Sequence, residues 1–450
     1  MEFKISKELI SQLENLIENN KEQEIYDLFQ EIHFADIAEI MEELNSHEAA
    51  YIFNALDSEQ TAEILKELDE DLREKILKNL TAKEIAEELD ELSTDDAADI
   101  ISELSQEKKE QVISELEDVE HAKDIVDLLR YDEDTAGGLM GKELVKVNEN
   151  WNVLTCVKEM RAQAENVSRV HSIYVVDDQQ RLKGRLSLKD LLTTSTKTPI
   201  SEIYIPKVDC VNVNTKDVEV ARIMQKYDLE AIPVVDELGR LVGRITIDDI
   251  VDVIKEEADK DYQLAAGITQ DVEADDSILE LTKARLPWLF LGLVGGIGAF
   301  IIMDFFEEKL HGEAVILFLF TPLIAAMAGN VGVQSSAIIV QGLANDDVKG
   351  SINNRLIKEM LLATLNGVIL SIVLFLFVYA WQFDVKLALA ISVSLVAVVI
   401  IAGLVGTFIP LFLDRRDIDP AIATGPFITT SNDIFGIVIY LIISKFILGI

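Results

Sequence analysis

The chain has 450 residues, of which 80 are acidic and 40 are basic, so its formal net charge is −40 at pH 7. Residues 281–450 contain 12 acidic and 10 basic residues, which leaves 68 acidic and 30 basic residues, a net charge of −38, in residues 1–280. An acidic surface of this kind repels phosphates, which argues against nucleic acid as a partner and favours cations as ligands.

The first residues, MEFKISKELI, show no signal peptide, so we expect the acidic half to remain in the cytoplasm. Cys156 and Cys210 form no pair of the metal-binding type, which agrees with a reducing compartment. The sequence has no glycine-rich phosphate loop and no constellation of a nucleophile with its base, so we do not expect an enzyme.

Residues 1–130 are predicted to form an acidic, all-α helical-repeat domain. Leucine recurs at every twelfth position from Leu44 to Leu116, and six of the seven residues that follow these leucines are good helix N-cap types, Glu117 being the exception. The pattern predicts short helices of about two turns. Two such units together give a period near that of helical solenoids.

The motif DDAAD lies within this repeat. Asp95 and Asp99 are one helical turn apart and therefore share one helix face, where their charges repel each other. Two interpretations remain open at this point: a solvated acidic face, or a divalent cation held between the carboxylates.

Two related segments follow, VVDDQQRLKGRLSLKD at 175–190 and VVDELGRLVGRITIDD at 234–249, which align without a gap. Each predicts a strand, a turn, a second strand and a helix that begins at DLL or DIV. The arrangement resembles a tandem pair of α/β CBS domains, which we place at 131–200 and 201–254.

Some CBS domains bind adenine nucleotides through Ser or Thr followed three residues later by Asp. The matching residues are Ser187 with Asp190 and Thr246 with Asp249, and ATP is the regulatory ligand that this interpretation implies. The same pattern is also an ordinary helix cap, so both interpretations remain open.

Residues 246–261, TIDDIVDVIKEEADKD, carry seven acidic and two basic residues. We predict a connecting (plug) helix at 255–280 between the CBS pair and the apolar half. A solvated helix has this composition, but its position also suits a switch that responds to divalent cations.

The last domain, residues 281–450, is predicted to be an α-helical membrane domain with five transmembrane helices. Each apolar run is long enough to cross a bilayer, at roughly 20 residues per span; the runs lie at about 286–306, 314–341, 358–383, 387–413 and 421–449. With the N-terminus in the cytoplasm, five spans place the C-terminus outside. The positive charges of the connections agree, with Lys283, Arg285, Lys349, Arg355, Lys358, Arg415 and Arg416 inside and Lys309 and Lys386 outside.

Polar residues concentrate in the second and fifth spans. Asn330 and Gln334 lie one turn apart among small residues, so they either join helices by hydrogen bonds or face a permeating ion. Asp433, in the motif TTSND, has no Lys or Arg near its depth in the span. A lone carboxylate in hydrocarbon is costly, so we interpret Asp433 as a cation ligand.

The order of these segments, together with the motifs AGNVGVQ, TTSND, YDEDTAGGLM and DIDPAIA, resembles the MgtE family of magnesium channels over almost the whole chain. The resemblance implies a homodimer whose pore lies between protomers and whose pore aspartate is Asp433, with Asn330 touching the hydrated ion. Lys260 stands where the family has an acid. The resemblance further implies a set of Mg2+-binding acids in the cytosolic domains and at the pore mouth: Asp95, Asp99, Asp228, Asp249, Asp252, Glu257, Asp261 and Asp419.

The expected function is therefore a Mg2+-selective channel in a bacterial-type inner or plasma membrane, which imports Mg2+ down its electrochemical gradient and closes when cytosolic Mg2+ binds the acidic domains. The expected partners are Mg2+, the lipid bilayer and a second copy of the chain. Two alternatives remain: a broader divalent channel that also passes Co2+ or Mn2+, and a membrane-anchored nucleotide or cation sensor without transport.

Overall fold

The computed structural model describes residues 5–164, 167, 169–170, 172–269, 272, 276–307, 312–344, 348, 351–416, 418–423 and 425–449. The chain divides into two compact units, residues 1–254 and residues 255–450. Lys309, Lys349 and the first residue of the DIDPAIA motif, Asp417, lie outside the described residues.

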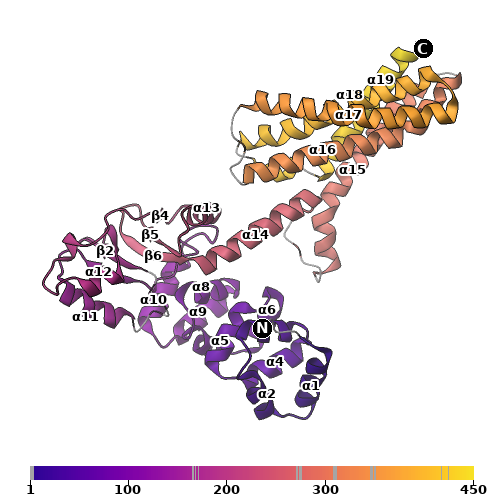
Figure 1. Cartoon of the computed structure of the whole chain (residues 1–450). Coiled ribbons are helices and arrows are strands. Elements are labelled where there is room, and N and C mark those ends of the chain that lie inside the picture. The colour runs from indigo at the N-terminus through magenta and orange to yellow at the C-terminus, as the bar shows by residue number, and fades with distance from the viewer. Residues whose placement is uncertain are drawn as a thin grey trace. The chain divides into compact units, whose positions relative to one another are not determined.

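The described part of the first unit begins with ten short helices (Figure 1). Helices two apart in the chain pack together, for example α3 with α5, α5 with α7 and α8 with α10, which is how a helical repeat buries one face of each helix. The helices are α1 (Lys7–Glu18), α2 (Glu22–Phe29), α3 (Phe34–Glu42), α4 (Ser46–Ala55), α5 (Ser58–Glu67), α6 (Glu70–Asn79), α7 (Ala82–Leu89), α8 (Thr94–Glu103), α9 (Gln106–Glu115) and α10 (Val119–Leu128).

The predicted leucine repeat is confirmed at the level of the helix caps. The six residues that follow the leucines from Leu44 to Leu104 are the N-caps of α4 to α9. In α4 and α7 the cap is a complete capping box, in which a Glu side chain accepts a hydrogen bond from the cap N–H. The seventh cap is Asp118 rather than Glu117, because the short Asp118 carboxylate accepts from the N–H groups of Glu120 and His121.

The predicted two-helix period appears in the burial of the same leucines. Leu44, Leu68, Leu92 and Leu116 are buried, whereas Leu56, Leu80 and Leu104 are only partly buried against the same core. Alternate helices therefore contribute differently to the core, and the structural repeat is a pair of helices.

Two small sheets follow, each with one parallel and one antiparallel pair. Both sheets have a register irregularity at equivalent positions, between Val175 and Val176 and between Val234 and Val235. The helices after the second hairpin strands begin two positions earlier than predicted, at Leu188 and Ile247. The elements are β1 (Val145–Asn148), α11 (Val153–Ala164), β2 (Ile173–Val176), β3 (Leu182–Leu186), α12 (Leu188–Thr193), η1 (Ile200–Glu202), β4 (Val211–Asn212), α13 (Asp217–Tyr227), β5 (Ala231–Val235), β6 (Leu241–Thr246) and α14 (Ile247–Ala266).

The two modules meet through their hairpin turns. The N–H of Leu182 donates to the Gly239 carbonyl at 3.0 Å, and the N–H of Leu241 donates to the Gln180 carbonyl at 2.9 Å. Gln180 and Gly239 occupy equivalent positions in the two aligned segments, and both have positive φ angles. The contact is therefore reciprocal, as expected for two related modules packed about a local two-fold axis.

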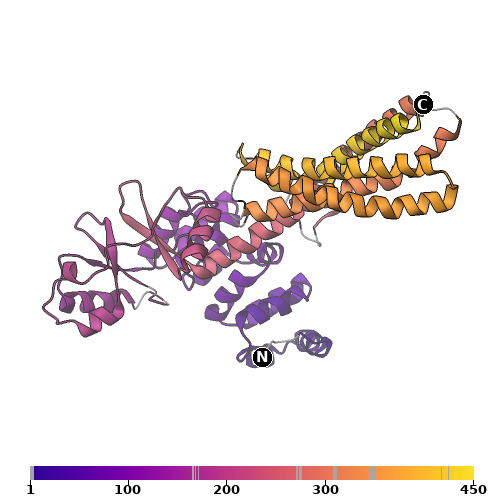
Figure 2. The same ribbon diagram turned by 45° about the horizontal axis from the view of Figure 1, so that its top comes forward.

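The described residues of the second unit include five helices that are long and apolar enough to cross a membrane, which confirms the five predicted spans (Figure 2). Helix α18 packs against α16, α17 and α19, and is the most deeply buried of the five. The elements are α15 (Ile278–Glu307), η2 (Gly312–Phe320), α16 (Thr321–Ala344), α17 (Ile352–Gln382), α18 (Val385–Asp414), η3 (Pro420–Ala423) and α19 (Gly425–Leu448).

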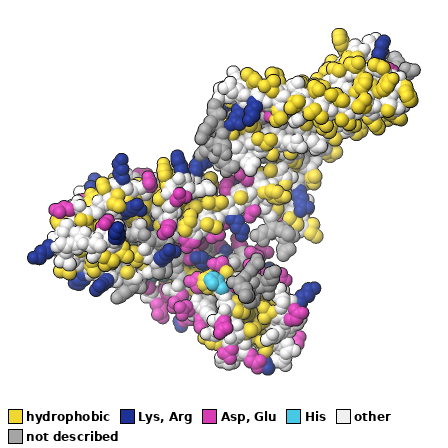
Figure 3. Space-filling view, in the orientation of Figure 1, with side chains coloured by type: hydrophobic (Ala, Val, Ile, Leu, Met, Phe, Trp, Pro, Cys, Tyr) yellow, Lys and Arg dark blue, Asp and Glu magenta, His cyan; other side chains and the backbone are white. Residues whose placement is uncertain are grey.

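The surface of this unit matches its composition. On the face shown in Figure 3, hydrophobic side chains cover the helical bundle of the second unit, whereas acidic side chains are spread over the helices of the first. Exposed residues such as Leu293, Ile301 and Phe377 are more than half accessible to solvent. A soluble protein rarely exposes so continuous an apolar surface, and a lipid environment explains it.

Candidate functional site

Asp433 lies in the third turn of α19, where α19 packs against α16. Thr429 and Asp433 are one turn apart and both face Gly329 of α16. A methyl group at Gly329 would lie 3.2 Å from Thr429 Cγ2 and 3.5 Å from Asp433 Oδ1. The glycine therefore lets the carboxylate approach the α16 backbone directly before Asn330.

The Asp433 side chain is half-buried. Among the described residues, it has no hydrogen-bond or ion-pair partner that accounts for its presence in a span. This is the environment expected of a carboxylate whose partner is a mobile ion.

Asn330 and Gln334 are both exposed on α16 within the protomer. Neither forms a side-chain hydrogen bond with another helix within the described part of the chain. Their amides therefore do not join the helices of one protomer in this structure. They remain available to the water shell of an ion or to a second copy of the chain.

The adjacent Asn432 behaves differently from Asp433. It is 1% exposed, and neither its amide oxygen nor its amide nitrogen has a hydrogen-bond partner among the described residues. Its side chain packs directly on Gly332 of α16, and on the other side Gly332 is in close contact with Gly406 of α18. Three helices thus meet at two glycines and one buried amide, immediately beside Asp433 in the chain.

We predict that Gly332→Ala destabilises the membrane unit by about 1–3 kcal/mol, because the new methyl group collides with Asn432 and overpacks the crossing. The matched control is Gly296→Ala on α15, where a methyl group meets no atom within 4 Å. Thermal unfolding of the purified protein in detergent measures both. Equal stability of the two variants would show that the crossing tolerates the methyl group.

Glu359 is a second carboxylate within a span, and the sequence analysis did not single it out. Ser335 of α16 donates a hydrogen bond of 2.6 Å to Glu359 Oε1. A methyl group at Gly403 of α18 would lie 2.9 Å from the same oxygen. Glu359 of α17 thus contacts both α16 and α18. The sequence offered one signal for this residue, an acidic side chain inside the predicted span 358–383.

The first unit contains an acidic cleft of about 790 Å³. Asp95 and Asp96 at the start of α8 face Asp249 at the start of α14, and Glu143 lies beside them. Glu143 accepts hydrogen bonds from the Thr94 N–H and hydroxyl at 2.9 and 3.0 Å. The cleft also contains cations, including Lys66, whose Nζ lies 3.1 Å from Asp96.

Burial and the crowding of carboxylates in and beside this cleft raise their pKa values. Burial, followed by the charges of Asp249 and Asp96, raises the pKa of Asp95 well above its usual value. Burial also raises the pKa of Asp249 to about 6, although hydrogen bonds from Thr246 oppose the rise. Asp99 lies one turn after Asp95, does not line the cleft and is exposed, yet partial burial, followed by the charges of Asp96 and Glu133, raises its pKa to about 7. A bound divalent cation would relieve this repulsion.

These shifts predict a pH dependence of stability. An unfolded Asp loses its proton near pH 3.8, whereas folded Asp99 and Asp249 hold theirs to about pH 7 and about pH 6. The folded unit therefore binds more protons across this window, and its stability falls as the pH rises through it. Without Mg2+, we expect the first unit of the intact protein to melt at a higher temperature at about pH 5.5 than at about pH 7.5.

Saturating Mg2+ at the higher pH is expected to recover most of this stability, since an ion that binds the folded form stabilises it by mass action. The control variant Asp95→Asn removes one repelling charge and should weaken both the pH dependence and the Mg2+ effect. A melting temperature that rises with pH over the same interval without Mg2+ would contradict the prediction.

A second acidic group lies in the second unit, at the C-terminal half of α14. Burial raises the pKa of Asp261, and the charges of Asp419 and Glu257 add to the rise. Asp419 also accepts a hydrogen bond of 2.8 Å from the Ala421 N–H at η3, before α19. Lys260 pairs with Glu257 at 3.5 Å and so partly neutralises this group.

Of the remaining sequence-predicted site residues, Thr246 lines the cleft beside Asp249, whereas Asp228 and Asp252 lie outside both acidic groups. Asp228 is the C-cap of α13 in the left-handed conformation, and Asp252 is exposed on α14. Thr246 donates from its N–H and its hydroxyl to Asp249 at 2.8 and 2.9 Å, which is a helix-capping arrangement.

In the other module, Ser187 caps α12 without a side-chain hydrogen bond, and Asp190 lies in the first turn. Within the described ranges, no group of three or more His, Cys, Asp or Glu side chains is arranged to enclose a metal ion. The acids described here form one open cleft in the first unit and one small group, Glu257, Asp261 and Asp419, in the second.

Comparison with known protein families agrees with these features. Residues 321–443 match a family model described as a divalent cation transporter, MgtE. Residues 32–134 match the MgtE intracellular N domain, and residues 136–196 and 200–256 match CBS domains. These matches define a multi-pass membrane protein for divalent cation transport with an intracellular N domain.

The chain belongs to the MgtE family of magnesium transporters, which are transporters and not enzymes. The magnesium transporter MgtE of Thermus thermophilus is 36% identical over 324 residues, 71% of this chain and 72% of that protein. MgtE of Enterococcus faecalis is 34% identical over 322 residues, 71% of each chain. A crystal structure of the cytosolic domain of the Mg2+ channel MgtE in complex with ATP is 36% identical, covers 54% of this chain and 99% of its own, and has a TM-score of 0.50.

Proposed function

We propose that this protein is a Mg2+-selective channel that admits Mg2+ to the cytoplasm and closes when Mg2+ binds its acidic cytosolic regions. The observation that carries the proposal is Asp433, a half-buried carboxylate without a partner among the described residues, beside the Gly329 backbone of α16. Magnesium keeps several of its waters and is usually bound through one or two carboxylates. A single aspartate per protomer is enough for such a site if two protomers share it.

The functional form is proposed to be a homodimer with the pore between protomers. Asn330 and Gln334 are exposed on α16, and Asn330 directly follows the Gly329 that Asp433 approaches, so they would face the partner or the hydrated ion. The apolar helix α15 is almost entirely exposed within one protomer and packs chiefly on α19. A second copy and lipid together are the natural cover for these faces.

The proposed orientation follows from the intracellular N domain. Five spans from that side place the α17–α18 connection and the C-terminus outside. A divalent ion entering the cytoplasm gains about 4.6 kcal/mol per 100 mV of membrane potential, so neither ATP hydrolysis nor a coupled ion is required.

Closure is proposed to follow from the two acidic groups. At low Mg2+ the carboxylates of the cleft and of the α14 group repel one another. At high Mg2+ the bridging ions stabilise the closed state, which is a shift of population toward the form that binds them better. The residues assigned to sensing are Asp95, Asp249, Glu257, Asp261 and Asp419 of the two groups, together with Asp99, Asp228 and Asp252, which lie outside them.

ATP is proposed as a second regulatory ligand of the CBS pair. A related cytosolic domain that is 36% identical has been crystallised with ATP. The residues assigned to nucleotide binding are Ser187, Asp190, Thr246 and Asp249. In this structure Thr246 and Asp249 cap α14, so binding would act on the same helix that carries the acidic residues.

The deciding experiment is metal uptake into sealed liposomes that contain the purified full-length protein, with Mg2+, Co2+, Mn2+ and Ca2+ offered separately. Uptake of Mg2+ well above that of the other ions supports the proposal. Equal uptake of Co2+ or Mn2+ would favour the broader divalent channel. If the folded protein takes up none of these ions, the remaining interpretation is a membrane-anchored sensor without transport.

A further inference from the structure

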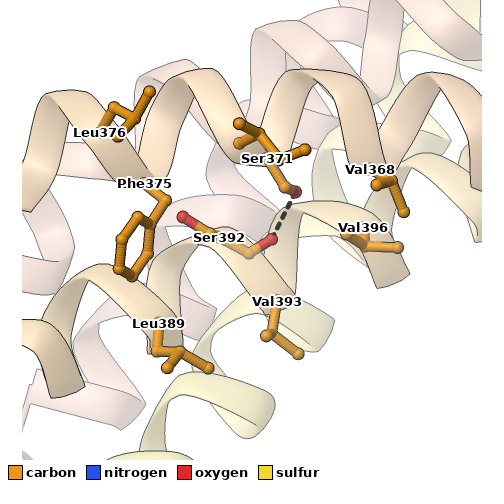
Figure 4. Close-up of a pocket in the computed structure, with 9 residues that line it drawn as sticks. Val368, Ser371, Phe375, Leu376, Leu389, Ser392, Val393 and Val396 are labelled. Atoms are coloured by element: carbon orange, nitrogen blue, oxygen red, sulfur yellow. Dashed lines mark hydrogen bonds between the residues drawn. The ribbon is translucent and has the colours of Figure 1, made fainter.

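An apolar crevice of about 260 Å³ lies between α17 and α18 on the outside of the helical bundle (Figure 4). Its walls are aliphatic except for Phe375, Ser371 and Ser392. Ser371 of α17 donates a hydrogen bond of 2.6 Å to the Ser392 carbonyl of α18, which holds the two helices together beside the crevice. The crevice is therefore part of the packed helix pair, and its open side faces away from the protomer.

The depth of the crevice places it in one leaflet. Leu389 lies one turn and Val396 three turns after Val385, the first residue of α18, which corresponds to about 6 and about 17 Å along the helix. The hydrocarbon core is about 30 Å thick, so the crevice spans the half next to the α17–α18 connection. With the orientation of the proposed function, on which this step rests, this is the outer leaflet.

A ladder of aromatic rings leads from the crevice to the α17–α18 connection. Phe375 in the crevice stacks on Tyr379 with ring centroids 6.2 Å apart, and Tyr379 contacts Phe383 at 6.3 Å. Phe383 is 80% exposed at the end of the helix. Aromatic residues at such a position mark the boundary between hydrocarbon and headgroups. The ladder thus forms a continuous apolar track from the boundary into the crevice.

A positive charge stands at the outer end of this track. Lys386, in the first turn of α18, is exposed and lies three positions before Leu389 of the crevice, so the two share a helix face. Its ammonium group has no ion pair with another described residue. The nearby Asp384 carboxylate is engaged in capping α18, where it accepts from the Lys386 and Leu387 N–H groups at 2.8 and 3.2 Å.

We propose that this crevice binds one acyl chain of a phospholipid of the outer leaflet, whose phosphate is held by Lys386. The chain follows the Phe383–Tyr379–Phe375 ladder and ends between α17 and α18. The apolar walls exclude water, and the lysine supplies the charge complement for the phosphate. The lipid bridges the ends of two helices whose neighbours, α16 and α19, carry the Asp433 site.

Ser392 distinguishes an acyl chain from a polar ligand. Its hydroxyl is buried within the crevice wall and has no hydrogen-bond partner among the described residues. An acyl chain offers no hydrogen bond to this hydroxyl, so Ser392→Ala should leave lipid binding equal or stronger. Weaker binding to the variant would indicate a polar ligand and would overturn the acyl-chain assignment.

The test uses the full-length protein in nanodiscs with a phosphatidylglycerol that carries a photoreactive group on one acyl chain. We expect cross-linking to peptides of the crevice in the unaltered chain and its loss in Val393→Trp, which fills the space. Leu365→Trp is the control, because Leu365 is an exposed residue of α17 outside the crevice. Unchanged cross-linking in Val393→Trp would overturn the proposal.

Lys386→Ala keeps the proposal testable if Val393→Trp does not fold, since the substitution lies at an exposed position. It should weaken retention of the lipid about fivefold, the effect expected for one lysine near an anionic headgroup. If Lys386→Ala does not change retention of the lipid, the proposed contact between Lys386 and the phosphate is wrong. If Val393→Trp separates dimers into monomers without changing lipid cross-linking, the crevice is an interface between copies of the chain and the lipid proposal fails.

Discussion

Replacement of Asp433 by alanine is expected to abolish Mg2+ uptake, or to reduce it by at least about tenfold, while the protein remains folded and assembled. The carboxylate has no partner in the protein among the described residues, so its removal breaks no contact of the fold. It removes instead a charge-assisted contact to the ion, worth about 1.5–3 kcal/mol for each hydrogen bond to a charged group. A dimer would lose two such groups at once.

Asp433→Asn separates charge from shape. The amide nearly matches the carboxylate in volume but carries no charge, so we expect it to fail almost as completely as alanine. The matched control is Asp304→Asn, which neutralises an exposed acid of α15. Uptake into liposomes, with the oligomeric state checked for each variant, measures the effect. Normal uptake in both Asp433 variants would rule out this residue as the pore carboxylate.

The architecture was predictable because its signals are periodic and local. The spacing of leucines and caps predicts the short helices, and the gapless match of two segments predicts the two CBS modules. The small errors are local as well. The seventh cap falls on Asp118, directly after the Glu117 that the sequence had already set apart as a poor cap, and the helices at Leu188 and Ile247 start two residues before the predicted boundary.

The candidate pore residue was also predictable, because Asp433 follows hydroxyl and amide residues in TTSND and has no Lys or Arg near its depth, whereas Glu359 directly follows Lys358. Its surroundings were not. Asn432 is adjacent to Asp433 in sequence but lies buried against Gly332, a residue of a different span. The hydrogen bond between Ser335 and Glu359 likewise depends on how α16 packs on α17. Such contacts are properties of helix packing, which no local pattern encodes.

The acidic cleft shows the same limit. DDAAD identified Asp95, but Glu143, which accepts two hydrogen bonds from Thr94, lies far beyond that motif in the chain. The cleft is also lined by three basic residues, Lys66, Arg169 and Arg244. They offset part of its negative charge, so the cleft is less acidic than the net charge of residues 1–280 suggests. Net charge therefore predicts a preference for cations, whereas the balance of charges at each site depends on the fold.

Joint neutralisation of Asp249, Asp252, Glu257 and Asp261 is expected to leave conduction intact but to raise the cytosolic Mg2+ concentration needed for closure. Asp249 faces Asp95 in the cleft, and Glu257 and Asp261 belong to the group with Asp419, so three of the four residues lie in the two acidic groups, while Asp252 is exposed on the same helix. If bridging ions hold the channel closed, the loss of their ligands removes the attraction. Patch recording with Mg2+ varied on the cytoplasmic face measures the shift, and an unchanged dose response would remove α14 from the sensor.

The opposite shift would mean that diffuse repulsion, and not ion bridging, sets the gate, because neutral residues would then let the unit compact at lower Mg2+. A matched control separates the two mechanisms: Glu8, Glu14, Glu18 and Glu39, all exposed on the first helices, changed together to Gln. Both variants change the net charge by the same amount. Repulsion between exposed charges is largely screened beyond about 8 Å at physiological salt, so the control should leave closure nearly unchanged. Carboxylates that directly bind Mg2+ affect closure only if they belong to the binding site. We therefore expect that closure requires more Mg2+ in the α14 variant but not in the control variant.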